Sequence, residues 1–484
     1  MRPRKYRILR PARRPPAARL PDGQGRAGTV GALTPRARAG QARLSLPLPE
    51  GLARIIKAAL RASDPRTLLL QKVSRHKEIL EAGRFRHDLT RYRHIYVIGA
   101  GKASGVMAAA LEEVLGDRIT DGLVVVKHAR AAGASRIRIV EAGHPIPDRA
   151  GIQAALNIIS LLKGLSERDL VIVLLSGGGS ALLPLPVEAV TLAQKQWTTQ
   201  LLLKSGASIH EINVVRKHLS QVKGGRLALL AAPAQVLTLV LSDVPGNLLD
   251  TIASGPTFPD PSTYGQAIHI LRRYHMWQNL PGPVRRHLAL GNGGGVSETP
   301  KPGDPAFERA QNLIIGDNCV ALKAAGEAAR SAGFRTQILT SFLKGEAREV
   351  AGVFGSIARE IHQGRQRPRG KACLLASGET TVTVLGKGKG GRCQEFVLAA
   401  AIEISGLPRT VVAAFGTDGA DGPTEAAGAY ADESTVHQAI LQGLDPVRFL
   451  HENDSFPFFK TLKHLIITGP TLTNLNDLYL LITY

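Results

Sequence analysis

The sequence predicts an α/β protein of two lobes: an N-terminal, Rossmann-like, doubly wound and mostly parallel sheet, followed by a C-terminal α/β domain. Short apolar runs alternate with helical stretches along the chain, as they do in parallel βαβ units. Four of the runs end in turns rich in glycine or acidic residues, at 99–102, 176–180, 242–243 and 416–418. Open α/β sheets bind ligands at such strand ends, so we expect the active site in the cleft between the lobes.

The length and composition limit the class of protein. A chain of 484 residues is long enough for two or three domains. Its three cysteines, Cys319, Cys373 and Cys393, are too few for a disulfide framework and lack metal-ligand spacing, which favours a reducing compartment such as the cytoplasm. No stretch approaches the roughly 20 apolar residues of a membrane span, so no membrane partner is expected.

The net charge of +22 is concentrated near the start of the chain. Residues 1–49 hold twelve of the 61 basic residues and a single acid, Asp22. This segment is rich in proline and poor in apolar residues, which predicts a disordered basic tail. We favour a solvated tail over a mitochondrial targeting signal, the alternative, because prolines would interrupt an amphipathic helix. The arginines are not interleaved with aromatic residues, so we expect no nucleic-acid partner.

The first predicted domain covers residues 51–290. Leu52, Ile55, Ile56 and Leu60 recur at helical spacing, and a second short helix is expected at 68–73. The alternating pattern then predicts strands at 95–98, 123–126, 137–140, 171–175 and 236–241, and helices at 103–115 and 151–162.

A stretch of linker composition, rich in glycine and proline, follows at 281–307. The second predicted domain covers residues 306–484. Its expected strands are at 313–315, 373–376, 382–385, 411–415, 465–468 and 478–482.

Two glycine-rich turns suit an anion. In the first, Gly99 and Gly101 let the backbone approach a ligand, and Lys102 can place its charge on a phosphate oxygen. The spacing is neither that of the P-loop nor that of the dinucleotide fingerprint, and a surface lysine at a helix start is the alternative. The second, Ser176-Gly177-Gly178-Gly179-Ser180, predicts a nest of phosphate-binding amides, strengthened by a helix from Ala181; a tight packing turn is the alternative.

A basic helix face is predicted within residues 210–226. Asn213, Lys217 and Ser220 share one face, which could line an anion site, while a solvated helix face explains the pattern equally well. The residues expected to face the core are Ile212, Val215, Leu219 and Val222.

Acidic residues and one arginine complete the candidate site. Asp243 follows a buried strand, where a carboxylate can hold magnesium, accept a hydroxyl proton or merely cap a turn. Arg392 follows two glycines and could grip a carboxylate or phosphate with two hydrogen bonds. Asp418 and Asp421 lie three residues apart among glycines and are secondary metal candidates.

These motifs, taken in order, resemble those of the class II glycerate kinases, the glycerate 2-kinase family whose C-terminal portion is called the MOFRL domain. The resemblance extends from about residue 52 to the C-terminus. In the first lobe it rests on GAGKAS at 99–104, LLSGGGSALL at 174–183, INVVRKHLSQVKGGRLA at 212–228 and SDVPGNLLDTIASGPT at 242–257. In the second it rests on GETTV at 378–382, GKGGRCQE at 388–395, GTDGADGPTEAAGA at 416–429 and TGPTLTNLNDL at 468–478.

The resemblance implies transfer of the γ-phosphoryl group of ATP, with Mg²⁺, to the 2-hydroxyl of D-glycerate, giving 2-phosphoglycerate and ADP. It implies that Lys102 and Arg392 are essential. Together with the motifs, it gives catalytic residues Lys102, Arg392 and Asp243; nucleotide-binding residues Gly99, Gly101, Ser176, Gly177, Gly178, Gly179, Ser180 and Glu379; substrate-binding residues Asn213, Lys217 and Arg392; and metal ligands Asp243, Asp418 and Asp421. The expected partners are glycerate and ATP, for a monomer or a homodimer.

Three positions depart from the family's pattern: Ser377 and Leu472 stand where glycine is usual, and Cys393 replaces an asparagine. Leu472 would be unfavourable if its position needs a positive φ. The alternative function is a nicotinamide-dependent reductase of hydroxypyruvate or tartronate semialdehyde. The turn at 99–104 lacks the third glycine of a dinucleotide site, which argues against that alternative.

Overall fold

The computed structural model describes residues 48–128, 134–364 and 371–484. The predicted basic tail at 1–49 lies outside these ranges except for its last two residues. Within the described ranges the chain forms two six-stranded sheets and one small three-stranded sheet. No helix among the described residues is long and apolar enough to cross a membrane.

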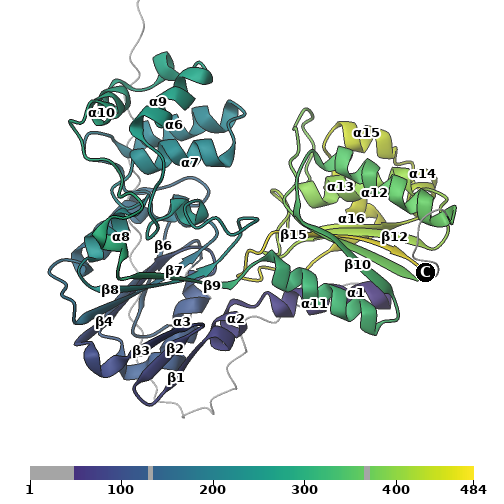
Figure 1. Ribbon diagram of the computed structural model, residues 1–484. Helices are drawn as coiled ribbons and strands as arrows, with labels where there is room; N and C mark the ends of the chain where they lie inside the picture. The colour runs from purple at the N-terminus through teal and green to yellow at the C-terminus, as the bar shows by residue number, and fades with distance from the viewer. Residues whose placement is uncertain (1–47, 129–133, 365–370) are drawn as a thin grey trace, which may run out of the picture. The chain divides into compact units, whose positions relative to one another are not determined.

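The first large sheet is parallel throughout. Its strands are β4 (His94–Ala100), β5 (Asp121–Val126), β6 (Arg138–Glu141), β7 (Asp169–Ser176), β8 (Gln235–Leu241) and β9 (Ala310–Gly316). They lie in the order β6-β5-β4-β7-β8-β9 (Figure 1). This is the doubly wound order of a Rossmann-like sheet, in which the direction of strand addition reverses between β4 and β7. The predicted fold class is confirmed.

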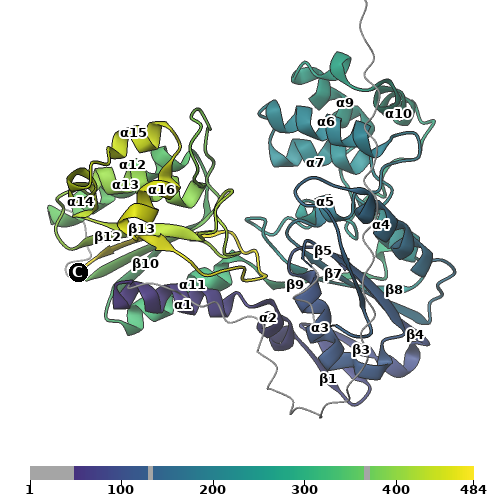
Figure 2. The same cartoon turned by 180° about the vertical axis from the view of Figure 1, so that it is seen from behind.

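Helices cover both faces of this sheet, which explains why its strands are almost purely apolar. Along β7, Ile172 and Leu174 pack with α2 (Pro65–Lys72) and α3 (Ser104–Leu115). The alternate residues Val171 and Val173 pack on the other face with α4 (Arg149–Leu161). Figure 2 shows α4 and the strands of this sheet from behind.

Two segments join a different sheet from the one that the sequence pattern predicts. The strand expected at 313–315 to open the second region is β9, which pairs in parallel with β8 at the edge of the first sheet. Conversely, α1 (Glu50–Ala62) buries Leu52 and Ile55 in the core of the second sheet, against α11 (Asn318–Ser331). Each of the two sheets, with its core, therefore includes a segment from the other side of the predicted domain boundary.

A helical subdomain, α6 (Leu192–Lys204), α7 (Ile209–His218), α9 (Tyr264–Arg273) and α10 (Gly282–Asn292), lies between β7 and β9 in the sequence. It has a core of its own, which includes Val215 and Tyr264. Helix α7 ends at His218, earlier than the apolar spacing predicts, although Leu219 and Val222 are buried as expected. Helix α8 (Arg226–Ala231) follows two glycines.

A small antiparallel sheet precedes β4 and was not predicted. It consists of β1 (Val73–His76), β2 (Ile79–Ala82) and β3 (Phe85–Asp88). Helix α2 covers 65–72, close to the predicted helix at 68–73, and the chain turns into β1 at Val73.

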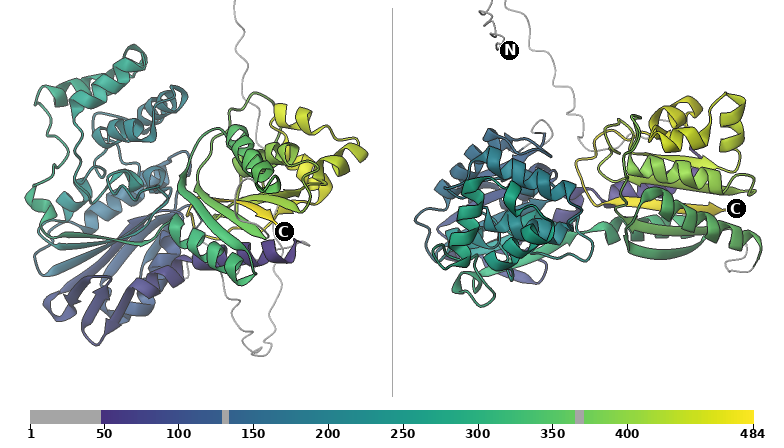
Figure 3. Two further views of the ribbon diagram at one scale, coloured as in Figure 1. Left: turned by 45° about the vertical axis from the view of Figure 1, so that its right-hand side comes forward. Right: turned by 90° about the horizontal axis from the view of Figure 1, so that it is seen from above.

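The second large sheet is mixed. Its order is β10 (Arg335–Leu343), β11 (Ala372–Gly378), β15 (Asp477–Thr483), β12 (Thr410–Gly416), β13 (Gly428–Asp432) and β14 (Leu465–Ile466), with only β10 and β11 parallel. Helix α11 covers one face, and α12 (Ala347–His362), α13 (Arg392–Glu403), α14 (Thr435–Leu441), α15 (Pro446–His451) and α16 (Ser455–Leu462) lie on the other (Figure 3).

The strand expected at 382–385 does not form. Val384 and Leu385 are 70% and 73% exposed, so these apolar residues have no buried face to occupy. The backbone amides bond to side chains instead: that of Thr383 donates to Glu346, and that of Leu385 donates to Asn453.

The aromatic core of the second sheet gives a test of its packing. Phe396 is fully buried between Phe354 and Tyr479, with ring centroids 5.1 and 4.9 Å away. Phe396→Ala should lower the free energy of unfolding by about 3–5 kcal/mol, because it removes a ring and leaves a cavity. Phe342→Ala, at a side chain that is 55% exposed, should cost less than about 1 kcal/mol. Equal losses in denaturant titrations of the two variants would contradict this packing.

Candidate functional site

The ends of β4 and β7 meet where the strand order reverses. The backbone amide of Lys102 donates to the carbonyl of Gly177 at 2.8 Å, so the two glycine-rich turns are in direct contact. Gly178 has φ +87°, a conformation that favours glycine. The helix expected from Ala181 is only the four-residue α5 (Gly179–Leu182), too short to contribute much of a dipole.

Ser176 is a buried anchor of this turn. Its Oγ accepts a hydrogen bond from the amide of Ala103 at 3.0 Å and lies 3.2 Å from Oγ of Ser104. A Cβ on Gly101 would come within 2.0 Å of the Ser176 hydroxyl, and one on Gly99 within 2.2 Å of a β7 carbonyl. These contacts favour a role for the three residues in joining β4 to β7, rather than direct contact with a nucleotide.

Ser180 is tied to the helical subdomain. Its Oγ is 2.8 Å from Oγ of Ser254, and the Ser254 hydroxyl donates to Oδ1 of Asn213 at 3.1 Å. Asn213 in turn donates to the carbonyl of Thr251 and is buried. Asn213 therefore reaches the triple-glycine turn through Ser254.

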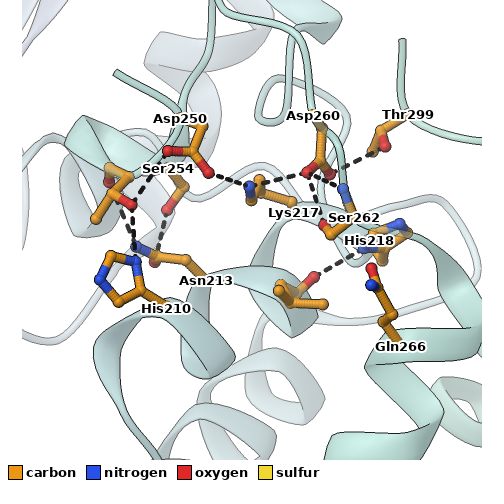
Figure 4. A network of polar contacts seen from close by, with 12 residues as sticks. His210, Asn213, Lys217, His218, Asp250, Ser254, Asp260, Ser262, Gln266 and Thr299 are labelled. Atoms are coloured by element: carbon orange, nitrogen blue, oxygen red, sulfur yellow. Dashed lines mark hydrogen bonds and ion pairs between the residues drawn. The ribbon is translucent and has the colours of Figure 1, made fainter. Parts of the chain in front are cut away.

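Lys217 is buried and paired, not solvated. Its ammonium lies 2.9 Å from Asp260 and 3.3 Å from Asp250, as Figure 4 shows. Asp260 is fully buried and also accepts bonds from Ser262 and Thr299. This geometry rules out the solvated helix face and favours a structural ion pair over direct substrate contact. A cavity of about 380 Å³ adjoins it, lined by residues that include Lys217, Asp250, His210 and His269.

Lys102 contacts a residue of the second sheet. Its Nζ is 3.1 Å from Oδ2 of Asp418, which follows β12. His144 lies beside it, since a Cβ on Gly178 would be 3.0 Å from the His144 ring and 3.3 Å from Cγ of Lys102. Burial, together with the charge of Lys102, lowers the pKa of His144 to about 4, so this imidazole is neutral at neutral pH.

Asp243 lies against the bare backbone of Gly177. Asn474 donates from Nδ2 to Oδ2 of Asp243 at 3.1 Å. A Cβ on Gly177 would come within 2.2 Å of that same oxygen and 2.5 Å of the Asn474 amide. The turn at 177 must therefore lack a side chain for Asp243 and Asn474 to meet there.

The environment of Asp243 favours its protonated form. Burial, and to a smaller extent the charge of Glu379, raise the pKa of Asp243 to about 6 against the opposing attraction of Lys102. A carboxylate with this pKa is ionised at neutral pH and is a stronger base than an ordinary aspartate.

Arg392 is held at the start of α13 by two carboxylates. Its Nη2 lies 2.9 Å from Oδ1 of Asp477, its Nε contacts the other oxygen of the same carboxylate, and its Nη1 lies 3.0 Å from Glu379. Burial lowers the pKa of Arg392, but Asp477 and Glu379 raise it by more, so the guanidinium stays charged. Asn476 Nδ2 lies 3.4 Å from Glu379.

A pocket of about 540 Å³ opens beside this pair. Arg392, Glu379 and the glycines of the 388–391 loop line it together with Val384 and Pro423. The Arg392–Glu379 ion pair and apolar side chains therefore line the same pocket.

Asp421 caps helix α13. Its two carboxylate oxygens accept the backbone amides of Cys393 at 3.0 Å and Gln394 at 2.8 Å. Burial raises the pKa of Asp421 to about 6, although these hydrogen bonds oppose the shift. With both oxygens used in this way, the arrangement favours helix capping over the predicted metal role.

The three departures from the family's pattern have distinct environments. Ser377 donates its hydroxyl to the carbonyl of Asp477 at 2.9 Å. Cys393 is fully buried, and burial raises the pKa of its thiol well above the ordinary value. Leu472 has φ +60°, so this position does adopt the conformation in which glycine is favoured.

The donor set suits Mg²⁺ better than a soft metal. Asp243 and Asp418 offer oxygen ligands, and Oδ1 of Asn476 is buried without a hydrogen-bond partner. The described residues hold no group of three or more histidine, cysteine or acidic side chains placed around one metal position. A site with few protein ligands fits Mg²⁺, which commonly binds one or two carboxylates and completes its shell with phosphates and water.

Three residues of this site, Asn474, Asn476 and Asp477, were not among the predicted site residues. Asn474 and Asn476 lie in the polar turn before β15 and Asp477 is the first residue of that strand; the sequence marks them only as a cluster of asparagine and aspartate. The other site loops follow their strands, whereas this turn precedes one: β15 runs antiparallel to β11 and β12, so its start lies at the edge where those two strands end.

Taken together, a lysine and a bare glycine turn at the reversal point of a Rossmann-like sheet lie next to an arginine and carboxylates of a second α/β sheet. That arrangement is typical of α/β proteins that bind phosphate-bearing ligands.

Comparison with known proteins names the family. Residues 51–289 match the model of a domain of unknown function (DUF4147), and residues 372–477 match that of the MOFRL family. The chain is 42% identical to the glycerate 2-kinase of Pyrococcus horikoshii, over 89% of this chain and 96% of the relative. It is 41% identical to a putative hydroxypyruvate reductase of Agrobacterium vitis, over 88% of this chain and 92% of that relative.

A solved structure supports the same family. The crystal structure of a glycerate kinase from Thermotoga maritima superimposes with a TM-score of 0.77 at 40% identity, covering 90% of this chain and 100% of that one. The chain belongs to the glycerate 2-kinase family, and the predicted resemblance is confirmed.

The raised pKa of Asp243 predicts a pH-dependent gain from Asp243→Asn. Folding favours the protonated carboxyl, so stability is lost as the pH rises from about 4 to about 6, where the unfolded state ionises first; above about pH 6 the loss is constant, and below about pH 4 it vanishes. The variant should gain about 1–3 kcal/mol in free energy of unfolding at pH 8 and nothing at pH 4. Denaturant titrations at both pH values measure this.

The matched control is Asp117→Asn, at a side chain that is 83% exposed. It should be neutral at both pH values. The same gain at pH 4 as at pH 8, or no gain at pH 8, would contradict the environment described for Asp243.

Proposed function

We propose that this protein phosphorylates D-glycerate on its 2-hydroxyl, using ATP and Mg²⁺, to give 2-phosphoglycerate and ADP. The observation that carries the proposal is that Lys102 and Asp243 meet at the glycine turn of β7. Glu379, which pairs with Arg392, lies close enough for its charge to act on Asp243. Support comes from relatives named glycerate 2-kinase and glycerate kinase at about 40% identity over most of the chain.

In this mechanism Asp243 accepts the proton of the 2-hydroxyl of glycerate while the oxygen of that hydroxyl attacks the γ-phosphorus of ATP. A bond forms between that oxygen and phosphorus, and the bond from phosphorus to the ADP oxygen breaks. The pKa of about 6 makes Asp243 a suitable acceptor at neutral pH. Asn474 orients its carboxylate by donating to Oδ2 at 3.1 Å.

Lys102 and Arg392 supply positive charge where negative charge builds up. Phosphoryl transfer depends mainly on positioning and on neutralising the phosphoryl oxygens. Lys102 would leave Asp418 to bind a phosphoryl oxygen, while Arg392 would bind the carboxylate of glycerate or the transferring group. Asp477 holds the guanidinium plane in a two-point contact, which fixes its direction.

Mg²⁺ would be held by Asp418, with Asn476 nearby as an oxygen donor, and would neutralise charge on the phosphates. Asp243 is the alternative ligand, in place of its role as the base. Compartment and oligomeric state, predicted as cytoplasmic and as monomer or homodimer, remain predictions.

The deciding experiment incubates the purified full chain with ATP, Mg²⁺ and D-glycerate and measures ADP release. Enolase uses 2-phosphoglycerate directly, so coupling to enolase without a mutase establishes the 2-position. ADP release without that coupling would contradict the 2-position. Oxidation of NADH or NADPH by hydroxypyruvate, without ADP release, would support the alternative function named for the Agrobacterium relatives.

Two alanine variants test the proposed roles of Lys102 and Arg392 in stabilising the transition state. Lys102→Ala and Arg392→Ala should each lower kcat at least about 100-fold, because each removes a charge that stabilises the transition state. Arg392→Lys should stay impaired, since one ammonium cannot replace the two-point contact with Asp477. Lys57→Ala, at an exposed position of α1, is the control and should retain full activity. Normal kcat in both Ala variants would refute the assignment.

A further inference from the structure

Two helices of the helical subdomain line one cavity, each with a single face. The lining positions on α7 are 210, 213, 214 and 217, and those on α9 are 266, 269 and 270. Residues three or four apart lie side by side on a helix, which explains this spacing. Residues 250–251 and 261–262 complete the wall, and the volume is about 380 Å³. A cavity of this size suits a small organic molecule.

The wall carries polar groups that the fold does not use. Within the part of the chain that the structure describes, the exposed ring of His269 has no hydrogen-bond partner, and Nε2 of Gln266 has none either. His210 contacts the Thr251 hydroxyl through Nδ1 at 3.3 Å, and its Nε2 is unpaired among the same residues. These groups can exchange hydrogen bonds with a ligand, and an imidazole ring can also stack on a planar one.

The charges of the cavity disfavour an anion. Among the described residues that line it, Lys217 is the only lysine or arginine. Its ammonium is shared between Asp250 and Asp260, as Figure 4 shows. One lysine between two carboxylates leaves a net negative charge, which repels a carboxylate or a phosphate.

Hydroxyl groups suit this wall better than an anion does. The side chain of Asp250 lines the cavity and is 29% exposed. Its contacts with Lys217 and the Thr251 hydroxyl are long, at 3.3 and 3.4 Å, so its oxygens can accept a further hydrogen bond. A carboxylate that accepts from ribose hydroxyls is a recurring feature of nucleotide sites in Rossmann-like folds.

The same cavity has an apolar part, formed by Val214, Pro261 and Ile270. Apolar side chains combined with a few hydrogen-bonding groups are typical of sites that bind a flat heterocycle such as a nucleobase. D-glycerate is small and polar throughout, so it would leave these three side chains uncovered.

Two hydrogen bonds connect the cavity to the glycine turn of β7. Asn213 lines the cavity, and its Oδ1 accepts from the Ser254 hydroxyl at 3.1 Å. Oγ of Ser254 lies 2.8 Å from Oγ of Ser180, at the end of that turn. The turn is therefore within reach of a phosphate chain attached to a ligand in the cavity.

We propose that the cavity between α7 and α9 binds the nucleoside of a nucleotide, with the base against Val214 and His269 and the ribose hydroxyls on Asp250. The proposal rests on the proposed function, under which the nucleotide is ATP and its phosphates lie at the glycine turn of β7. Lys217 does not contact the nucleoside in this arrangement, and its ion pair holds Asp250 in position.

The test measures binding of ATP and of inorganic tripolyphosphate to the full chain by calorimetry, and KM for ATP and for D-glycerate by steady-state assay. His269→Ala removes a ring from the wall, and Val214→Phe fills part of the cavity. Each should weaken ATP binding about tenfold and raise KM for ATP by a similar factor, because contact with the base is lost. Tripolyphosphate has no nucleoside, so its binding should not change, and KM for D-glycerate should stay within about threefold.

Stability separates loss of binding from loss of folding. His269 is exposed and has no partner to lose among the described residues, so the Tm of unliganded His269→Ala should equal that of the parent. Val214→Phe is the second variant should His269→Ala fail to fold. His437→Ala, at an exposed position of α14, is the matched control and should bind both probes as the parent does.

Unchanged ATP binding in both variants would overturn the proposal. Equal weakening of ATP and tripolyphosphate would also overturn it, because the cavity would then act on the phosphates. So would a rise in KM for D-glycerate with KM for ATP unchanged, since the cavity would then hold glycerate. If ATP binding weakens as expected while no preparation phosphorylates glycerate, the nucleoside site stands and the proposed function falls.

Discussion

The close approach of three chain segments at Gly177 is the constraint on which the rest of the site depends. Asp243 and Asn474 occupy the space that a side chain at 177 would need, and the carbonyl of Gly177 accepts the amide of Lys102. The reversal of strand order between β4 and β7 opens that space. A glycine there brings a carboxylate, a lysine and a side-chain amide from three parts of the chain to one point.

Opposite charges are unequally distributed around this point. The second sheet supplies carboxylates, of which Asp477 is buried and serves to hold Arg392. The helical subdomain supplies cations in two kinds of setting: Lys217 is paired with Asp250 and Asp260, whereas Lys223 forms no ion pair with any residue that the structure describes and bonds instead to the carbonyl of Ala253.

Much of the fold follows from local pattern. The strands at 95–98 and 171–175 are apolar because both faces of their sheet are covered, so pattern and burial agree. The local pattern predicted wrongly where tertiary contacts determine the structure. The run at 382–385 is apolar but includes the exposed Val384 and Leu385 and forms no strand. The sequence of β9 is typical of the start of a new domain, although β9 completes the first sheet. In the site, the sequence placed Lys102 in the turn after β4, as the structure has it. It did not predict α13, which begins at Arg392. The sequence could not show that Lys217 forms a buried ion pair, because its partner Asp260 lies 43 residues away along the chain.

The position of β15 has a consequence for how a growing chain acquires this structure. That strand lies between β11 and β12, pairs with both, and carries Asp477 at its start. Until residues 477–483 emerge from the ribosome, the two neighbouring strands present unpaired edges, which attract other strands. Synthesis that stalls before Asp477 would therefore leave a chain without the partner of Arg392 and with a sheet open to aggregation, a natural substrate for chaperones.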